Sequence, residues 1–151
     1  MRAFAIIYLL ILLFSISSGA HAQHISESEL SLGRVAIGQS EKDVVKLHGA
    51  PGNKKKTGEG NLLIYRDFEV YVGVGSYGVF DVISKNPKDC TPSKVCPGTS
   101  ISTANHLYGP PVVASRENGT YFEYTPDGST CWLQVSAPND IILSLRIACQ
   151  P

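Results

Sequence analysis

Three glycines, Gly73, Gly75 and Gly78, fit the G-x-G-x-x-G spacing that binds the pyrophosphate of a dinucleotide. That chemistry requires a strand before the glycines and a helix after them, because the phosphate sits at the N-terminus of the helix. Residues 79–83 are instead mostly apolar and rich in β-branched side chains, which predicts a strand. The sequence therefore predicts a glycine-rich hairpin tip, and it predicts no cofactor.

Residues that could act in hydrolysis are present but form no recognisable set. Beyond position 22 the chain has His24, His48 and His106, and it contains no H-x-x-x-H pair and no G-x-S-x-G motif. Glu69 and Glu123 lie in predicted strands and could face one surface of a sheet, where paired carboxylates act as acid and base. A small hydrolase using Glu69 or Glu123 is one hypothesis, but we expect a protein without catalytic residues.

The N-terminal segment indicates export. Met1-Arg2 gives a positive start, residues 3–14 form an uncharged, mostly aliphatic run, and Ala20-His21-Ala22 fits the A-x-A cleavage pattern. These features predict a secretory signal peptide over residues 1–22, with an uncleaved anchor as the alternative. The apolar run is shorter than the roughly 20 residues that span a bilayer. We therefore expect no transmembrane span after cleavage.

Four cysteines lie in the second half of the chain: Cys90, Cys96, Cys131 and Cys149. They permit three pairings, and the sequence does not decide among them. We favour Cys90–Cys96, which closes a short loop containing Pro92, and Cys131–Cys149, which staples a hairpin whose turn lies near residues 137–140. A zinc site is the alternative, but no C-x-x-C pair occurs and export favours disulfides.

Composition restricts the class of function. The 151 residues include 13 Lys+Arg and 13 Asp+Glu, whereas a nucleic-acid-binding domain usually has a basic excess, so we expect no nucleic-acid partner. Charged residues make up 17% of the chain and apolar residues 43%, which is too apolar for a disordered tail and too polar for a multi-span membrane protein. The basic run Lys54-Lys55-Lys56 is predicted to lie in a solvated loop.

The elements that must position these residues follow a repeat with an offset of 60 positions. In each copy a serine can cap a helix, apolar side chains three positions apart share one helix face, and a glycine can end the helix in a left-handed conformation before a proline. Each copy therefore predicts a short helix. The recurring residues are Gly38, Ser40, Leu47, Gly49 and Pro51, and then Gly98, Ser100, Leu107, Gly109 and Pro111.

Three strand-like segments follow each predicted helix, separated by glycine, asparagine and proline turns. We therefore predict an α+β fold made of two tandem units, each with a helix and a three-stranded antiparallel meander, with the helices on one face of a sheet that is either continuous or paired. The strands are predicted at residues 61–65, 68–74, 79–84, 121–124, 131–136 and 141–149. The domain division is a flexible leader at 23–32, a first unit at 33–89, a disulfide-closed linker loop at 90–96 and a second unit at 97–151.

The pattern I-G-x-S-x-x-x-V-x-x-L-x-G-x-P, from Ile37 to Pro51, resembles the small outer-membrane lipoprotein family SmpA/OmlA, which has the BamE-like domain. Two such units in one exported chain resemble the tandem β-lactamase inhibitor protein (BLIP-like) fold. That resemblance implies binding of a target by a concave sheet face and a projecting hairpin tip, which here is Ser76-Tyr77. The lipid-anchor cysteine of the outer-membrane family is missing from this chain.

Strand alternation predicts the face that binds. Apolar residues such as Val70 and Leu133 alternate with polar and aromatic ones, and the apolar set, including Val74, should pack under the helices while the other set meets solvent. Tyr, Trp and Arg are enriched at binding hot spots. Burial of Trp132 in the core is the alternative. The candidate partner-binding residues are Glu69, Tyr71, Ser76, Tyr77, Glu123, Trp132, Gln134 and Arg146.

From these features we expect an exported, non-enzymatic protein-binding module that needs no metal. Its partner would be another protein: an enzyme, a toxin or an envelope component. An inhibitor or immunity protein that neutralises a toxin or lytic enzyme in the bacterial periplasm fits best, with an extracellular location as the alternative. An envelope or outer-membrane maintenance factor of the SmpA/BamE-like type is the alternative function.

Overall fold

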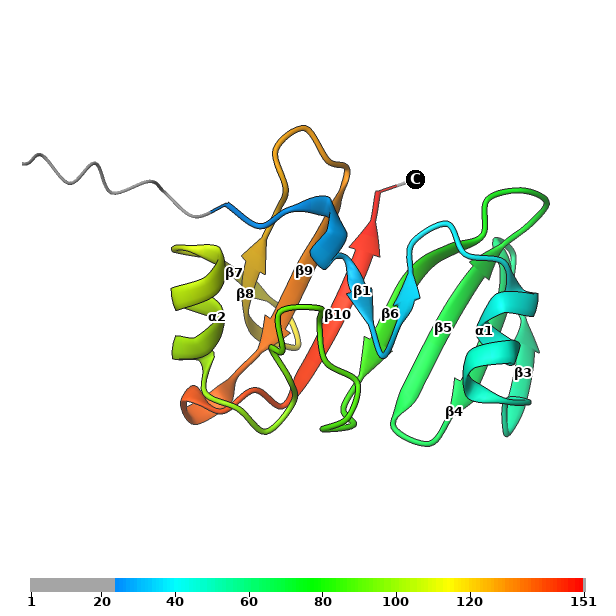
Figure 1. The fold of residues 1–151 in the computed structure, drawn as a ribbon, viewed down its shortest axis with the longest axis horizontal. Coiled ribbons are helices and arrows are strands. Elements are labelled where there is room, and N and C mark those ends of the chain that lie inside the picture. Colours follow the sequence, from blue (N-terminus) through cyan, green and yellow to red (C-terminus); the bar gives the residue numbers. More distant parts are fainter. Residues whose placement is uncertain (1–23, 151) are drawn as a thin grey trace, which may run out of the picture.

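The computed structural model describes residues 24–150, so the predicted signal peptide and its cleavage site lie outside the described residues (Figure 1). The described chain is mostly sheet, with two α-helices, α1 (Glu41–His48) and α2 (Ile101–Tyr108). Short 3-10 helices lie at Glu27–Glu29 and Pro138–Asp140. The strands are β1 (Ser31–Leu32), β2 (Val35–Ala36), β3 (Asn53–Lys56), β4 (Gly60–Tyr65), β5 (Phe68–Gly73), β6 (Val79–Ser84), β7 (Val112–Arg116), β8 (Gly119–Tyr124), β9 (Cys131–Ser136) and β10 (Ser144–Cys149).

Eight strands form one antiparallel sheet in the order β3-β4-β5-β6-β10-β9-β8-β7, while β1 and β2 form a separate two-stranded ribbon. At the centre β6 pairs with β10, with Ser84 opposite Leu145 and Asp81 opposite Ala148. The predicted fold class, two tandem helix-plus-meander units of the BLIP/BamE-like type, is therefore wrong. The backbone ladder runs without interruption through the centre, so neither half of the chain has a sheet of its own.

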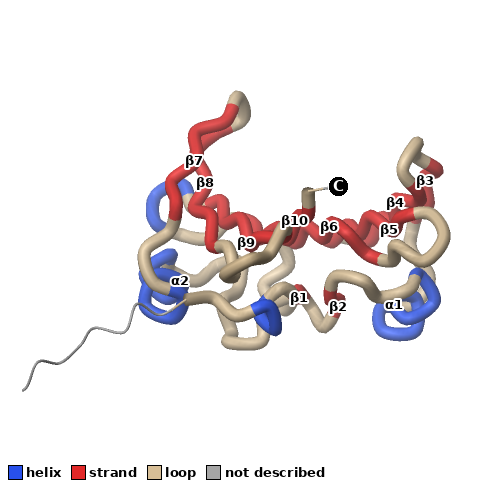
Figure 2. The backbone as a smooth tube through the Cα atoms, turned by 90° about the horizontal axis from the view of Figure 1, so that it is seen from above, coloured by secondary structure: helices blue, strands red, loops and turns tan. Residues whose placement is uncertain are grey.

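Both helices and the β1–β2 ribbon lie on the same side of the eight-stranded sheet (Figures 1 and 2). The ribbon contacts β6 and β10 and so covers the central pairing. The opposite side carries no helix among the described residues. Figure 2 shows that the β7–β8 hairpin and the β3–β4 end of the sheet rise on this bare side, so the bare face is concave.

The core lies between the sheet and its helical cover. Val70 of β5, Leu133 of β9 and Ile147 of β10 are fully buried and alternate with residues that face the other way. Val44 of α1 and Ala104 of α2 belong to the same buried cluster. Full burial of a Val, Leu or Ile side chain stabilises a fold by roughly 1.5–3 kcal/mol. Because only one face of the sheet is buried, apolar and polar residues alternate along these strands, as the sequence predicted.

The two predicted helices are confirmed. Ser40 Oγ accepts a hydrogen bond from the Asp43 N–H, and the Asp43 carboxylate accepts one from the Ser40 N–H, so α1 begins with a complete capping box. Ser100 caps α2 through the Ser102 N–H. The glycine that follows each helix has φ of 80°, a value that favours glycine.

The two edge strands of the eight-stranded sheet, β3 and β7, were not predicted from the sequence. The lysines at positions 54–56 belong to β3 rather than to a loop, and all four β3 residues are exposed. Lysine on an edge strand discourages pairing with another chain, which explains a composition that otherwise reads as a loop. β5 ends at Gly73, so Val74 is 65% exposed and does not join the buried set as predicted.

Residues 24–32, predicted as a flexible leader, are packed instead. Ile25, Leu30 and Leu32 are buried in the core. Glu29 is also buried, and its carboxylate accepts hydrogen bonds from the Ser93 N–H (3.1 Å), the Ser93 Oγ (2.8 Å) and the Tyr108 hydroxyl (2.6 Å). This nine-residue segment, with three buried leucine or isoleucine side chains and one carboxylate that is hydrogen-bonded through both oxygens, therefore belongs to the fold.

Both disulfides form, and they pair the cysteines as we favoured, Cys90 with Cys96 and Cys131 with Cys149. Cys131 and Cys149 lie opposite each other where β9 begins and β10 ends. The loop between Cys90 and Cys96 carries the buried Val95 under the sheet. Closing a loop of this kind stabilises a small domain by roughly 2–3 kcal/mol through the unfolded chain.

The Glu29–Tyr108 contact generates a stability prediction. Tyr108→Phe removes the hydroxyl that donates to Glu29 and shares a 2.7 Å hydrogen bond with Thr91, which leaves buried polar groups underbonded. We expect the free energy of unfolding in urea to fall by about 1–3 kcal/mol. Tyr77→Phe, at a side chain that is 76% exposed, is the matched control and should change it by less than about 0.5 kcal/mol. Equal effects of the two variants would contradict the network.

The same tyrosine gives a pH dependence. Burial, followed by the hydrogen bond to Glu29, raises the pKa of Tyr108 well above 10. Burial also raises the pKa of Tyr124 to about 12. Because the unfolded tyrosines ionise first, stability should be complete below about pH 10 and should fall as the pH rises toward the folded pKa values. Urea titrations at pH 8 and pH 11 should show a smaller fall in Tyr108→Phe than in the wild type.

The β5–β6 turn gives a test of close backbone packing. Gly78 has φ of 65°, and a Cβ built there would lie 2.4 Å from the Gly38 carbonyl oxygen. Gly128 has a similar φ of 73° but open space around it. Both glycine-to-alanine changes carry the strain of a positive φ, about 1–2 kcal/mol. Gly78→Ala should lose at least about 1 kcal/mol more than Gly128→Ala in urea unfolding, because backbone must move.

Candidate functional site

The bare concave face carries two rows of side chains that run across the strands. One row contains Trp132, Ala148, Asp81 and Tyr71, which lie opposite one another in β9, β10, β6 and β5. The neighbouring row contains Glu123, Gln134, Arg146, Ile83 and Glu69 in β8, β9, β10, β6 and β5. Six of the eight predicted binding residues therefore share this face, because each sits between core-facing neighbours along its strand.

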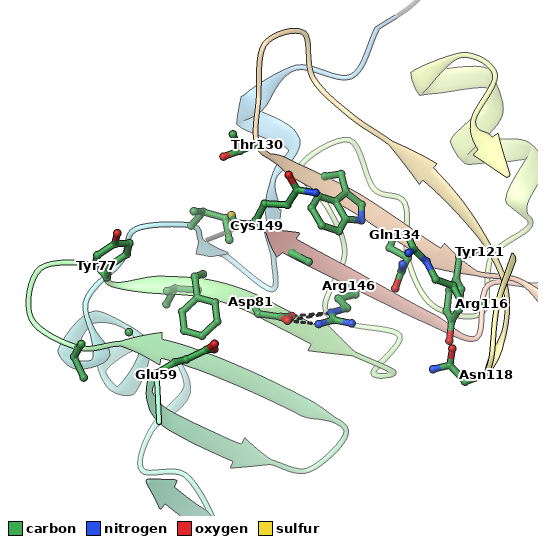
Figure 3. Close-up of a pocket in the computed structure, with 18 residues that line it drawn as sticks. Glu59, Tyr77, Asp81, Arg116, Asn118, Tyr121, Thr130, Gln134, Arg146 and Cys149 are labelled. Carbon is green, nitrogen blue, oxygen red and sulfur yellow. Dashed lines mark hydrogen bonds and ion pairs between the residues drawn. The ribbon is translucent and has the colours of Figure 1, made fainter. Parts of the chain in front are cut away.

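A groove of about 790 Å³ is hollowed in this face. Arg116, Asn118 and Tyr121 gather at one end, and Glu59 and Tyr77 lie at the other (Figure 3). Among the predicted residues, Tyr77, Trp132, Gln134 and Arg146 line the groove. Glu69 and Tyr71 lie on the face beside it, Glu123 contacts Gln134, and Ser76 lines a neighbouring pocket of about 590 Å³.

An ion pair between Arg146 and Asp81 spans the central pairing on the groove floor (Figure 3). The Arg146 Nε donates to Oδ1 (3.0 Å) and Oδ2 (3.1 Å) of Asp81, and Nη2 donates to Oδ2. The Asp81 side chain is 9% exposed and that of Arg146 is 43% exposed. The contact fixes one edge of the guanidinium group and leaves the other edge on the open side.

Burial decides the electrostatics of this pair. It raises the pKa of Asp81 above its usual value, although the hydrogen bonds and charge of Arg146 act in the opposite direction. The hydrogen bond to Asp81 raises the pKa of Arg146 despite the partial burial of that side chain. The two directions are consistent because the desolvation falls mainly on the carboxylate, which is the more deeply buried partner.

A β-bulge places Asp81 on this face, where strand alternation did not predict it. In the β5–β6 ladder Tyr71 lies opposite Asp81 and Val72 opposite Val79, so Phe80 is an extra residue on β6. Phe80 and Asp81 therefore both line the groove, and the Phe80 ring lies 6.1 Å from that of Tyr71. Alternation alone would have placed only one of these two consecutive residues on this face.

A second carboxylate, Glu123, is held in the same way. Its Oε1 accepts hydrogen bonds from Arg116 Nη2 (2.7 Å) and Gln134 Nε2 (2.8 Å). Glu69 lies four strand spacings away along the same row, which corresponds to about 19 Å at the usual interstrand distance. Paired catalytic carboxylates in glycoside hydrolysis stand about 5–10 Å apart. The paired-carboxylate arrangement is therefore not formed.

The other chemical candidates occupy structural positions. The three glycines lie at the end of β5 and in the turn at residues 74–78, as predicted, and a strand rather than a helix follows them. His48 bonds through Nε2 to the Gly33 carbonyl oxygen (3.0 Å) and stacks on Phe68. Residues 24–150 contain no group of three or more His, Cys, Asp or Glu side chains arranged to hold a metal ion.

No protein-family model matches the sequence, and no curated protein matches it. Solved structures do share its fold. One is an extracellular protein containing an SCP domain from Bacillus anthracis str. Ames, with 13% sequence identity, a TM-score of 0.52, and coverage of 76% of this chain and 44% of that one. Another is a cysteine-rich secretory protein from Staphylococcus aureus subsp. aureus Mu50, with 13% identity, a TM-score of 0.54, and coverage of 85% and 48%.

These matches correct the predicted family. The resemblance to SmpA/OmlA proteins and to the tandem BLIP-like fold is wrong, because the structures that share the fold are of other proteins. The motif from Ile37 to Pro51 encodes a helix cap, an apolar helix face and a helix stop, which are local features that many helix-to-strand junctions need. This chain spans less than half the length of each solved structure, so the likeness shows the fold alone.

The two disulfides are typical of an exported protein, because the reducing cytosol does not sustain structural disulfides. None of the helices within residues 24–150 has the length and apolarity needed to cross a membrane.

The ion pair on the groove floor gives a prediction. Arg146→Leu leaves the buried Asp81 carboxylate without its cation, so the free energy of unfolding at pH 7 should fall by about 1–3 kcal/mol, less than for a fully buried pair because Arg146 is partly exposed. Asp81→Asn/Arg146→Leu should recover part of this loss. Because burial raises the pKa of Asp81, the loss should shrink as the pH falls from 7 toward 4. Equal losses at both pH values would contradict this account.

Proposed function

We propose that this protein is an exported, non-enzymatic module that binds another protein on the concave face of its sheet. The observation that carries the proposal is the groove of about 790 Å³ at the centre of that face, lined by aromatic side chains and crossed by an ion pair. As an inhibitor or immunity protein, it would act by covering the functional surface of a toxin or lytic enzyme. The partner is a protein of the bacterial envelope or one that reaches it.

The composition of the groove supports binding. Tyr77, Tyr121 and Trp132 supply large side chains with few rotatable bonds, and Arg116 and Arg146 supply planar guanidinium groups. Tyr, Trp and Arg dominate the energetics of protein interfaces. Tyr77 is 76% exposed at the β5–β6 turn, which gives it no role in the core of this chain. Burial of the Tyr77 ring against a partner would remove its apolar surface from water, which favours association.

Rigidity of the face supports the same reading. The groove lies on the strands themselves, and the Cys131–Cys149 disulfide joins two of them beside Trp132. A binding surface that is formed before the partner arrives loses less conformational entropy on association. We propose the periplasm as the compartment, because an oxidising compartment sustains the two disulfides.

Affinity capture tests the proposal. The chain without residues 1–22, tagged at the C-terminus, should retain a stoichiometric protein from bacterial envelope extracts. Replacing Tyr71, Tyr77 and Trp132 together with Ser should reduce retention at least about tenfold, because hot-spot residues are each worth about 2 kcal/mol or more. Tyr77→Ser alone, at an exposed position that does not disturb the fold, should give a partial loss.

Ile141→Ser/Leu143→Ser is the matched control, since it removes exposed apolar side chains that do not line the groove. It should retain the partner as the wild type does, and circular dichroism should show that all variants are folded. Retention that is unchanged in the triple variant would reject the concave face as the binding surface. Capture of outer-membrane assembly proteins would support envelope maintenance instead of inhibition.

A further inference from the structure

Two arginines that line the groove retain unused guanidinium donors. Arg146 uses Nε and Nη2 to bind Asp81, and its Nη1 makes no hydrogen bond to any described residue. Arg116 uses Nη2 to bind Glu123, and its Nε and Nη1 are likewise without a partner in residues 24–150. Both side chains line the groove, and they are 43% and 50% exposed. Arg146 is therefore anchored on its Nε–Nη2 edge and Arg116 through Nη2 alone, and both guanidinium groups retain unused N–H donors.

The acids that anchor these groups are already engaged. Both oxygens of Asp81 accept from Arg146, and Oε1 of Glu123 accepts from Arg116 and Gln134. Glu59 is exposed at the far end of the groove, opposite Arg116 in Figure 3. The end formed by β7, β8 and β10 thus offers unpaired N–H donors on two guanidinium groups, each of which is already ion-paired with one carboxylate, and the residues that line it include no unpaired acid facing these donors.

We propose that this end of the groove binds a carboxylate of the partner protein, an Asp or Glu side chain on a projecting loop, on the open edges of Arg146 and Arg116. The inference rests on the proposed function and specifies its chemistry. A guanidinium edge presents two parallel N–H groups that match the two oxygens of a carboxylate. Because the hydrogen bonds to Asp81 already fix the orientation of the Arg146 guanidinium, this side chain loses little conformational entropy on binding.

Arginine rather than lysine is required for this geometry. Arg146→Lys keeps the positive charge that faces Asp81 but removes the fork that can bind two carboxylates on two edges. Arg66→Lys is the matched control, because Arg66 is 97% exposed and does not line the groove. A long-range charge effect would be the same in both variants, whereas a fork effect would appear in Arg146→Lys alone.

Titration with a blocked peptide tests the proposal without the natural partner. The probe is Gly-Gly-Glu-Gly-Gly, acetylated and amidated at its ends, and the control probe has Gln in place of Glu. Trp132 lines the groove and is the single Trp of the chain, so its indole N–H gives one assignable NMR signal beside the Arg Nε–H signals. The expected result is a saturable shift of the Trp132 and Arg146 signals by the Glu peptide, with a dissociation constant in the millimolar range, and none by the Gln peptide.

Arg146→Lys should weaken binding of the Glu peptide at least fivefold, and Arg66→Lys should leave it unchanged. The proposal is overturned if the Glu and Gln peptides shift the signals equally, if both variants weaken binding equally, or if no saturable shift occurs up to 20 times the expected millimolar constant. These failures are separate from failure of the proposed function. Capture of a partner through Tyr71, Tyr77 and Trp132 would stand even if the carboxylate did not bind.

Discussion

The pairing of β6 with β10 is the interaction on which the rest of the structure depends. It joins two four-stranded halves into one sheet, and it places Asp81 and Arg146 beside each other although they are 65 positions apart in the chain. The β1–β2 ribbon covers this pairing on the helical side, and the groove lies over it on the bare side. Without it each half would expose a central edge of unpaired backbone groups, and the groove would have no floor.

Local structure could be predicted from the sequence wherever one residue type decides it. Ser40 and Ser100 begin the helices, the glycines nine positions later end them, and the alternation around Tyr71 and Trp132 shows which side chains face away from the core. These features depend on neighbours in the chain, so the spacing of residue types is sufficient to read them.

Long-range structure could not be read in the same way. The repeat of 60 positions predicted two tandem units and left a continuous and a paired sheet equally open, because nothing in either copy specifies which strand edge remains open for the other. β3 was missed because its lysines protect an edge rather than fill a core, and Asp81 was missed because the bulge at Phe80 shifts the alternation by one residue. The segment around Glu29 was predicted as a flexible leader because the sequence does not show that Ser93, 64 positions away, is the hydrogen-bond partner of this carboxylate.

The bare face is held rigidly, but some of its hydrogen-bond donors have no partner among the described residues. Its strands are held by the ladder and by a disulfide, while the guanidinium groups in the groove retain unused donors and Tyr77 stands in solvent. Interfaces draw their affinity from groups of this kind, which are ordered beforehand and gain bonds on association. The core-facing side shows the opposite balance, since its buried carboxylates at Glu29 and Asp89 are hydrogen-bonded within the fold.

The position of β10 has a consequence for how the chain folds. β10 is the last described strand in chain order, yet it occupies the middle of the sheet, between β6 and β9. While the polypeptide emerges from a ribosome or a translocation channel, β3–β6 and β7–β9 can each form an antiparallel meander. The edges at β6 and β9 stay unpaired until β10 arrives. Such non-local closure slows folding and exposes the edges to aggregation. Folding of this domain therefore depends on β10, and a chain stopped before β10 would hold two unjoined half-sheets.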